Sequence, residues 1–162
     1  MALYSVQGVD VIQRDSPRPT SAAARYSGLH RKTVVLPAGH QRGPAYRGFR
    51  AETIYERDIE IPLRDGTILR ADVYRPNNTA EKVPILLAWS PYGKSDTGFF
   101  SLDLVPGRAG VPQSKMSGYE SFEGPDPAEW TARGYAIVNI NTKGSFDSEG
   151  DFVLVNCDVS CK

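Results

Sequence analysis

The chain has 162 residues, and its 19 Lys and Arg residues balance 19 Asp and Glu residues, so the formal net charge is zero. Without a net positive charge we expect no long-range attraction to nucleic acid or anionic lipid. The hydrophobic fraction of 40% and the aromatic fraction of 10% exclude a wholly disordered chain. The length fits one domain, complete or incomplete, and is too short for two.

The charge is unevenly distributed along the chain. Residues 1–50 hold 8 basic and 2 acidic residues, a net charge of +6, whereas residues 51–162 hold 11 basic and 17 acidic residues, a net charge of −6. The first stretch mixes Pro, Ser, Ala and Arg without a lasting hydrophobic period. It predicts a basic, largely irregular N-terminal arm over residues 1–50, flexible up to about Lys32. We interpret the arm as a solvated lead-in; a regulatory or membrane-surface role is the alternative.

The sequence favours a cytoplasmic location. Its longest uncharged apolar stretch, residues 83–89, is far shorter than the roughly 18 to 20 residues that span a bilayer. Asp10 and Arg14 interrupt the apolar start, which argues against a secretory signal. A mitochondrial presequence is the alternative, and Asp10 and Asp15 count against it.

Two strands and a tight turn are predicted first along the chain after the arm. Apolar residues set among charged ones from Ile54 to Leu63 are typical of a half-exposed strand. Asp65-Gly66 follows, a pair that tolerates the positive φ angles of a hairpin turn. A second alternating run begins at Ile68 and is ended by Pro76. We therefore expect an antiparallel hairpin.

A strand-helix-strand unit is predicted next. Residues 83–89 are continuously apolar, as in strands of parallel sheets that are buried on both faces. After a long Gly-, Ser- and Pro-rich region, Asp126-Pro127 can cap a helix of about two turns that Gly134 stops. Residues 135–141 form another apolar strand, parallel to the first. The sheet is therefore predicted to be mixed, with an antiparallel hairpin leading into a parallel α/β layer.

Five ordered blocks between Tyr55 and Phe152 resemble the cocaine-esterase and X-prolyl dipeptidyl-peptidase group of α/β-hydrolases. They are Arg64-Asp65-Gly66-Thr67, Ala71-Asp72-Val73-Tyr74-Arg75-Pro76, Ser90-Pro91-Tyr92-Gly93-Lys94, Trp130 with Arg133-Gly134-Tyr135-Ala136, and Thr142-Lys143-Gly144 with Ser148-Glu149-Gly150-Asp151. The segment between residues 106 and 127 resembles an insertion of fungal members. The resemblance implies that residues 51–155 are the N-terminal part of an α/β-hydrolase domain, ending before the nucleophile strand, and that residues 156–162 are a divergent tail. Asn141 and Lys143 replace the usual Asp and Arg, and Lys cannot make a two-pronged carboxylate contact.

What the resemblance implies chemically is acyl transfer, with a serine nucleophile activated by a histidine and an aspartate. In the family a tyrosine hydroxyl of the Pro-Tyr block helps to hold the oxyanion, and Tyr92 occupies that position here. Tyr92 is therefore the candidate catalytic residue; packing beneath the following loop is the alternative. A preorganised donor of this kind can lower the barrier by about 3 kcal/mol. No cofactor is expected.

The remaining catalytic residues are not found in the sequence. No Gly-x-Ser-x-Gly pentapeptide occurs, and at the nearest approach, around Ser148, Phe146 fills the first Gly position. Both histidines, His30 and His40, precede the first predicted strand, whereas the histidine of this fold comes late. The only two cysteines lie near the C-terminus and are interpreted as incidental thiols (Cys157 and Cys161), so no metal site is expected.

The sequence thus predicts a truncated serine-hydrolase family member, an incomplete α/β-hydrolase fold without activity of its own. By family analogy the strand at residues 135–141 lies inside that at residues 83–89, which becomes an open edge with both faces partly uncovered. Poor solubility, self-association or pairing with a paralogue through this edge is expected. A noncatalytic partner-binding fragment is the alternative function. A self-contained hydrolase using Ser148 and a histidine of the arm is the third. Small esters or X-prolyl peptides are the substrates of the complete family.

Overall fold

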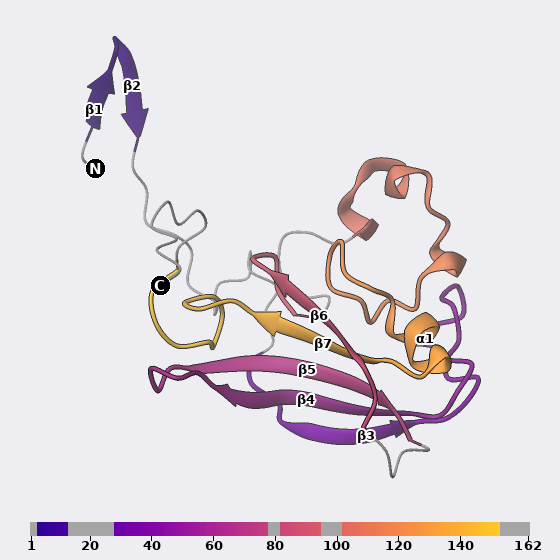
Figure 1. The fold of residues 1–162 in the computed structure, drawn as a ribbon. Coiled ribbons are helices and arrows are strands. Elements are labelled where there is room, and N and C mark those ends of the chain that lie inside the picture. Colours follow the sequence, from indigo (N-terminus) through magenta and orange to yellow (C-terminus); the bar gives the residue numbers. More distant parts are fainter. Residues whose placement is uncertain (1–2, 13–27, 78–81, 95–101, 153–162) are drawn as a thin grey trace.

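The computed structural model describes residues 3–12, 28–77, 82–94 and 102–152, and a mixed five-stranded sheet dominates this part of the chain. The sheet strands are β3 (Lys32–Leu36), β4 (Thr53–Pro62), β5 (Ile68–Pro76), β6 (Ile85–Ser90) and β7 (Ala136–Asn141). Their order is β3-β4-β5-β7-β6, antiparallel throughout except for the parallel pair β6–β7 (Figure 1). β1 (Leu3–Val6) and β2 (Val9–Ile12) pair separately as an antiparallel hairpin.

The predicted hairpin is confirmed as β4 and β5. The turn between them places Gly66 at φ +85°, and the Asp65 carboxylate accepts the Thr67 backbone N–H at 2.9 Å. The register shifts between Glu56 and Ile59, where Asp58 has φ +55°. A bulge of this kind re-aims a side chain, and the side chain of Asp58 is only 1% exposed. A charged residue of a surface-like strand thus lies in the interior.

The predicted strand-helix-strand unit is also confirmed. α1 (Pro127–Trp130) begins after Asp126, whose side chain accepts the Ala128 N–H, and continues as a 3-10 turn over Thr131–Arg133. Gly134 ends it in the left-handed conformation at φ +83°. β7 then pairs with β5 on one side and with β6 on the other, and all six of its residues are buried.

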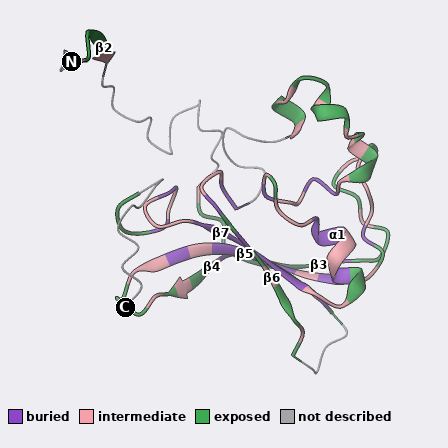
Figure 2. Ribbon diagram, turned by 45° about the horizontal axis from the view of Figure 1, so that its top comes forward, coloured by how far each residue is buried: buried purple, intermediate pink, exposed green. Residues whose placement is uncertain are grey.

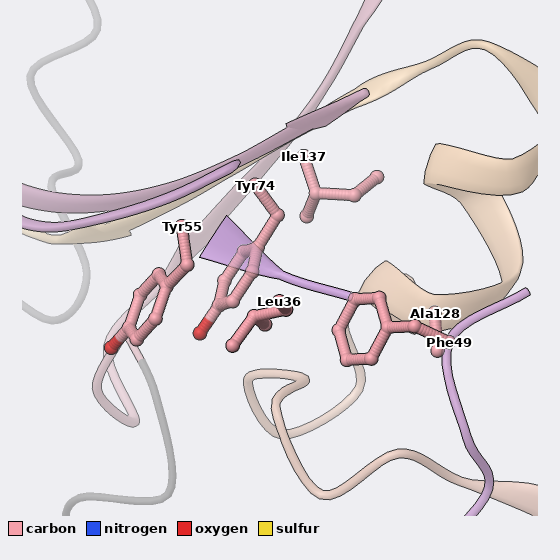
Figure 3. Packing of buried hydrophobic residues seen from close by; sticks show 6 residues of the cluster. All are labelled: Leu36, Phe49, Tyr55, Tyr74, Ala128 and Ile137. Carbon is pink, nitrogen blue, oxygen red and sulfur yellow. The ribbon is translucent and has the colours of Figure 1, made fainter. Parts of the chain in front are cut away.

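The hydrophobic core lies on both faces of the sheet. On the face covered by α1 and the loop before β4, Leu36, Phe49, Tyr55, Tyr74, Ala128 and Ile137 pack together, as Figure 3 shows. On the other face the cluster is Leu69, Ala71, Val138 and Ile140. Full burial of one large apolar side chain contributes about 1.5–3 kcal/mol, so both clusters stabilise the sheet.

The sequence predicted an irregular arm over residues 1–50 and the hydrolase-like part from residue 51. In the structure the sheet already begins before residue 51. β3 lies within residues 1–50 and pairs along its whole length with β4, and the β1–β2 hairpin also lies in the stretch expected to be flexible. Only residues 3–12 and 28–50 of the arm are described. The residues of the divergent tail, Cys157 and Cys161 among them, lie outside the described part of the chain.

β6 is an edge strand, as the family analogy predicted. Ile85, Leu87 and Trp89 are 61%, 54% and 55% exposed, whereas Ala88 and Ser90 are buried. The apolar composition of residues 83–89 is typical of burial on both faces, and the family analogy predicted that both faces would be partly uncovered. In the structure the exposed and buried residues alternate, so the described residues leave one face of β6 uncovered (Figure 2). Across the described ranges, no helix has the length and apolar character needed to cross a membrane.

Candidate functional site

Tyr92 lies just beyond the C-terminal end of β6, where the chain turns away from the sheet. Its backbone N–H donates to the Ser90 hydroxyl at 3.1 Å, and Ser90 is itself buried. The phenol ring meets the Phe122 ring edge-on, with centroids 5.3 Å apart. Tyr92 is thus held by the turn on one side and by the long loop before α1 on the other.

Tyr92 borders a cavity of about 490 Å³, which we call the Tyr92 cavity. Its walls come from residues 102–124 of the long loop and from Arg42 and Tyr46 of the segment between β3 and β4. A second hollow of about 420 Å³ follows the open edge at β6 and is also lined by Tyr92 and Phe122. A phenol between two hollows at the carboxyl end of a parallel strand occupies the position where ligands bind in open α/β sheets.

Lys94 fixes the chain two residues beyond Tyr92. Its backbone N–H donates to Asn141 Oδ1 at 2.8 Å. Its ammonium nitrogen lies 2.6 Å from Asp58 Oδ1 and 2.6 Å from Asp72 Oδ1, and all three side chains are at most 1% exposed. We call Lys94, Asp58 and Asp72 the buried triad. A fully buried Lys must be paired to be tolerated, and here it ties the Tyr92 turn to β4, β5 and β7.

The buried triad is held by further polar contacts. Asp72 accepts the Tyr55 hydroxyl at 3.1 Å and the Asp58 backbone N–H at 3.0 Å. Burial and the Asp72 charge raise the pKa of Tyr55 far above its ordinary value, so its hydroxyl stays a donor. Burial alone would raise the pKa of Asp58, but contacts with Lys94, the His30 backbone N–H and Arg57 hold it below its ordinary value. The carboxylate of Asp58 is therefore stabilised in its ionised form.

The two departures from the family block fall at the edge of this network. Asn141 supplies the amide oxygen that accepts the Lys94 N–H, a role that needs no charge. Lys143 contacts Asp65 at 2.8 Å at the exposed β4–β5 turn. This contact holds the pKa of Asp65 well below its ordinary value. Lys143 therefore makes a single ion pair with Asp65. A two-pronged contact is not available to a lysine.

The side chain of Ser148 forms hydrogen bonds with two backbone groups. Its hydroxyl donates to the Asn141 carbonyl at 2.8 Å and accepts the Arg70 N–H at 2.9 Å, and the residue is 6% exposed. His40 Nε2 lies 2.8 Å from the Tyr119 hydroxyl, and the backbone of His30 bonds to Asp58. Neither histidine is among the partners of Ser148, so the structure does not bring together the pair that a self-contained hydrolase would use.

Sequence reasoning missed the buried triad. Lys94 and Asp72 lie inside two of the resembling blocks, and Asp58 follows Arg57 where the strand alternation breaks. The break in alternation was the signal in the sequence that could have predicted the bulge at Asp58. Among the described residues, no group of three or more His, Cys, Asp or Glu side chains is placed to hold a metal ion.

Comparisons with known proteins identify a family and related sequences. Residues 65–159 match the family model of the X-Pro dipeptidyl-peptidase (S15 family). The cocaine esterase of Rhodococcus sp. (strain MB1 Bresler) is 32% identical over 96 residues, 59% of this chain and 13% of that protein. A protein of Aspergillus ustus named L-tyrosine:2-oxoglutarate aminotransferase ucdG is 38% identical over 66 residues, 41% of this chain and 13% of its own length.

A solved structure has a similar fold. The crystal structure of a CocE/NonD family hydrolase from Staphylococcus aureus aligns with 81% of this chain at a TM-score of 0.55 and 25% identity. The match spans 22% of the staphylococcal chain. This chain therefore corresponds to a minor part of each of these three proteins.

Proposed function

Since the chain belongs to the X-Pro dipeptidyl-peptidase (S15) family, we propose that it contributes the N-terminal sheet of a serine hydrolase in which Tyr92 binds the oxyanion. The reaction is hydrolysis of an ester or an X-prolyl amide. The observation that carries the proposal is the position of Tyr92, beyond the end of β6 and bordering a cavity of about 490 Å³. Tyr92 thus borders the space at the carboxyl end of β6, where ligands bind in open α/β sheets.

The proposed mechanism needs a donor whose orientation is set before the reaction. When a serine attacks the carbonyl, negative charge develops on its oxygen, and a prepositioned O–H lowers the barrier by about 3 kcal/mol. The buried triad and the Ser90 hydroxyl restrict the turn on both sides of Tyr92. Phe122 limits the swing of the ring. The phenol therefore reorganises little during the reaction.

The same proposal makes this polypeptide inactive by itself. The sequence has no Gly-x-Ser-x-Gly pentapeptide, and the Ser148 hydroxyl is hydrogen-bonded to two backbone groups. The nucleophile and its histidine would come from another segment of polypeptide. A cytoplasmic location remains a prediction from the sequence.

The experiment is a chimera. The corresponding N-terminal region of the Rhodococcus cocaine esterase is replaced by residues 28–152, and aryl-ester turnover is measured once the product elutes as a folded monomer. Tyr92→Phe should lower kcat about 100-fold with little change in KM. Tyr135→Phe is the matched control, since Tyr135 packs against Trp130 beside α1. Equal effects of the two changes would refute the role of Tyr92.

A second candidate function is a noncatalytic fragment that binds a partner through β6. The exposed Ile85, Leu87 and Trp89 on an open strand edge favour it. Strand addition by a paralogue or a second copy of this chain would pair the backbone of β6 on the side where no described strand lies. Pull-down with a full-length paralogue, lost on Leu87→Lys, would support this function over the first.

A further inference from the structure

The hollow of about 420 Å³ that follows the open edge at β6, which we call the edge hollow, has an unbalanced charge. The end of β6 with Pro91 and Tyr92 forms one wall, and residues 121–125 form the other. Of the described residues that line the edge hollow, only Glu123 is charged. The edge hollow therefore has one negative side chain and no described cation to balance it.

Glu123 lies in a tight turn with a strained backbone. The Gly124 N–H donates to the Ser121 carbonyl at 2.9 Å, which closes the turn around Phe122 and Glu123. Glu123 has φ +61°, in the left-handed region that residues with a side chain rarely adopt. Residues held in such conformations are concentrated at binding and catalytic sites. The conformation therefore favours a binding role for the Glu123 side chain.

The turn packs closely against β6. A Cβ atom at position 124 would clash with Ser121 Oγ and would lie 3.4 Å from Ala88 Cβ, so Gly124 leaves no room for a side chain unless Ser121 shifts. Ser121 and Ala88 are both buried. This close fit fixes the turn against the strand and keeps Glu123 at the edge hollow.

An open aromatic ring lines the same hollow as Glu123. Trp89 of β6 is 55% exposed, and Glu123 is exposed as well. Among the described residues, neither the Trp89 nor the Glu123 side chain has a hydrogen bond, an ion pair or a ring contact. The indole ring and the carboxylate are therefore both available to a ligand.

An organic cation satisfies both features of the edge hollow. A positive charge is attracted to a carboxylate and to the face of an indole ring, and alkyl groups around the charge bury apolar surface. A bare metal ion does not fit, because calcium and magnesium take about six or more oxygen ligands. Glu123 is the only carboxylate among the described residues that line the hollow.

We propose that the edge hollow binds a small organic cation, a quaternary ammonium ion. The cationic group lies between the Glu123 carboxylate and the Trp89 ring, and its alkyl groups lie against Leu87, which also lines the hollow. Binding needs no nucleophilic serine. It therefore stands apart from the proposed hydrolysis and is tested on this chain alone.

The test is a titration of the whole chain with choline chloride, followed by tryptophan fluorescence at constant ionic strength. Because the exposed edge of β6 favours self-association, the protein is kept at nanomolar concentration. We expect a saturable change in fluorescence at millimolar choline. Dimethylbutanol, the neutral carbon analogue of choline, should bind about tenfold more weakly, because it lacks the charge that the carboxylate and the indole ring attract.

Three variants locate the site. Glu123→Gln should weaken choline binding about fourfold, because it removes the exposed carboxylate. Glu60→Gln removes the same charge on β4, which β5 and β7 separate from β6, and should leave the affinity unchanged. Trp89→Phe should abolish the fluorescence change, since the other tryptophan, Trp130, lies in α1 against Tyr135.

Any of four results would overturn the proposal. The first is the absence of a saturable change in a chain whose circular dichroism shows a folded sheet. The second is dimethylbutanol binding as tightly as choline, which removes the charge from the recognition. The third is an equal loss of affinity in Glu123→Gln and Glu60→Gln, and the fourth is a fluorescence change that persists in Trp89→Phe. Because Glu123 and Trp89 are exposed, neither substitution should unfold the chain.

Discussion

The ammonium nitrogen of Lys94 lies 2.6 Å from Asp72 Oδ1, and both side chains are at most 1% exposed. Lys94 comes directly after the Tyr92-Gly93 turn, whereas Asp72 belongs to the central strand β5. The candidate oxyanion donor is therefore connected to the most buried part of the sheet. Any change at this pair should affect both the stability of the fold and the position of Tyr92.

Lys94→Met is the first prediction. The variant leaves Asp58 and Asp72 as two buried carboxylates without their cation, so the free energy of unfolding should fall by about 3–5 kcal/mol. Urea denaturation measures it. Lys143→Met breaks only the exposed contact with Asp65 and should change the midpoint little. A Lys94→Met variant as stable as the parent would show that the triad does not hold the turn.

The second prediction concerns pH. The folded state lowers the pKa of Asp58, so the stability gained from its ionised form is present above the pKa of the unfolded chain. It is lost as the pH falls through the lower folded value. Urea midpoints measured from neutral pH downward should therefore fall, and Asp58→Asn should start lower and flatten this acid limb. An Asp58→Asn profile that runs parallel to the parent profile contradicts the assignment.

Much of the sheet could be predicted from the sequence because its signals are local. The Asp65-Gly66 turn fixed the β4–β5 hairpin, and the Asp126-Pro127 start with the Gly134 stop located α1. The order of β7 and β6 came from the family resemblance and agrees with the structure. These elements depend on neighbours within a few residues or on motifs of fixed spacing.

The rest depends on contacts between distant segments. β3 is five residues long, with four of the five exposed, so its sequence carries no alternation that distinguishes it from a loop. The buried triad joins positions 58, 72 and 94, and only the bulge at Asp58 turns that side chain inward. The cavity lined by Lys32, Arg42 and Tyr119 likewise forms where β3, the following loop and Tyr119 meet.

The third prediction concerns the open edge. Wild-type chain should self-associate at micromolar concentration, because Ile85, Leu87 and Trp89 of β6 are exposed and no strand of the described part of the chain pairs with the outer edge of β6. Leu87→Lys should shift it toward the monomer without lowering the thermal midpoint, since Leu87 is 54% exposed. Light scattering after gel filtration reports the mass. Val35→Lys, at a similarly exposed position (49%) on the opposite edge strand β3, serves as the control. A monodisperse wild-type monomer would contradict this prediction.

The most direct test of the account is whether this polypeptide carries a reactive serine. Purified chain is incubated with a fluorophosphonate probe and, separately, with an aryl ester, beside its Ser148→Ala variant. We predict no labelling and no turnover above the buffer rate in either protein. Labelling of the parent together with ester turnover that Ser148→Ala abolishes would show a complete catalytic centre and contradict the account.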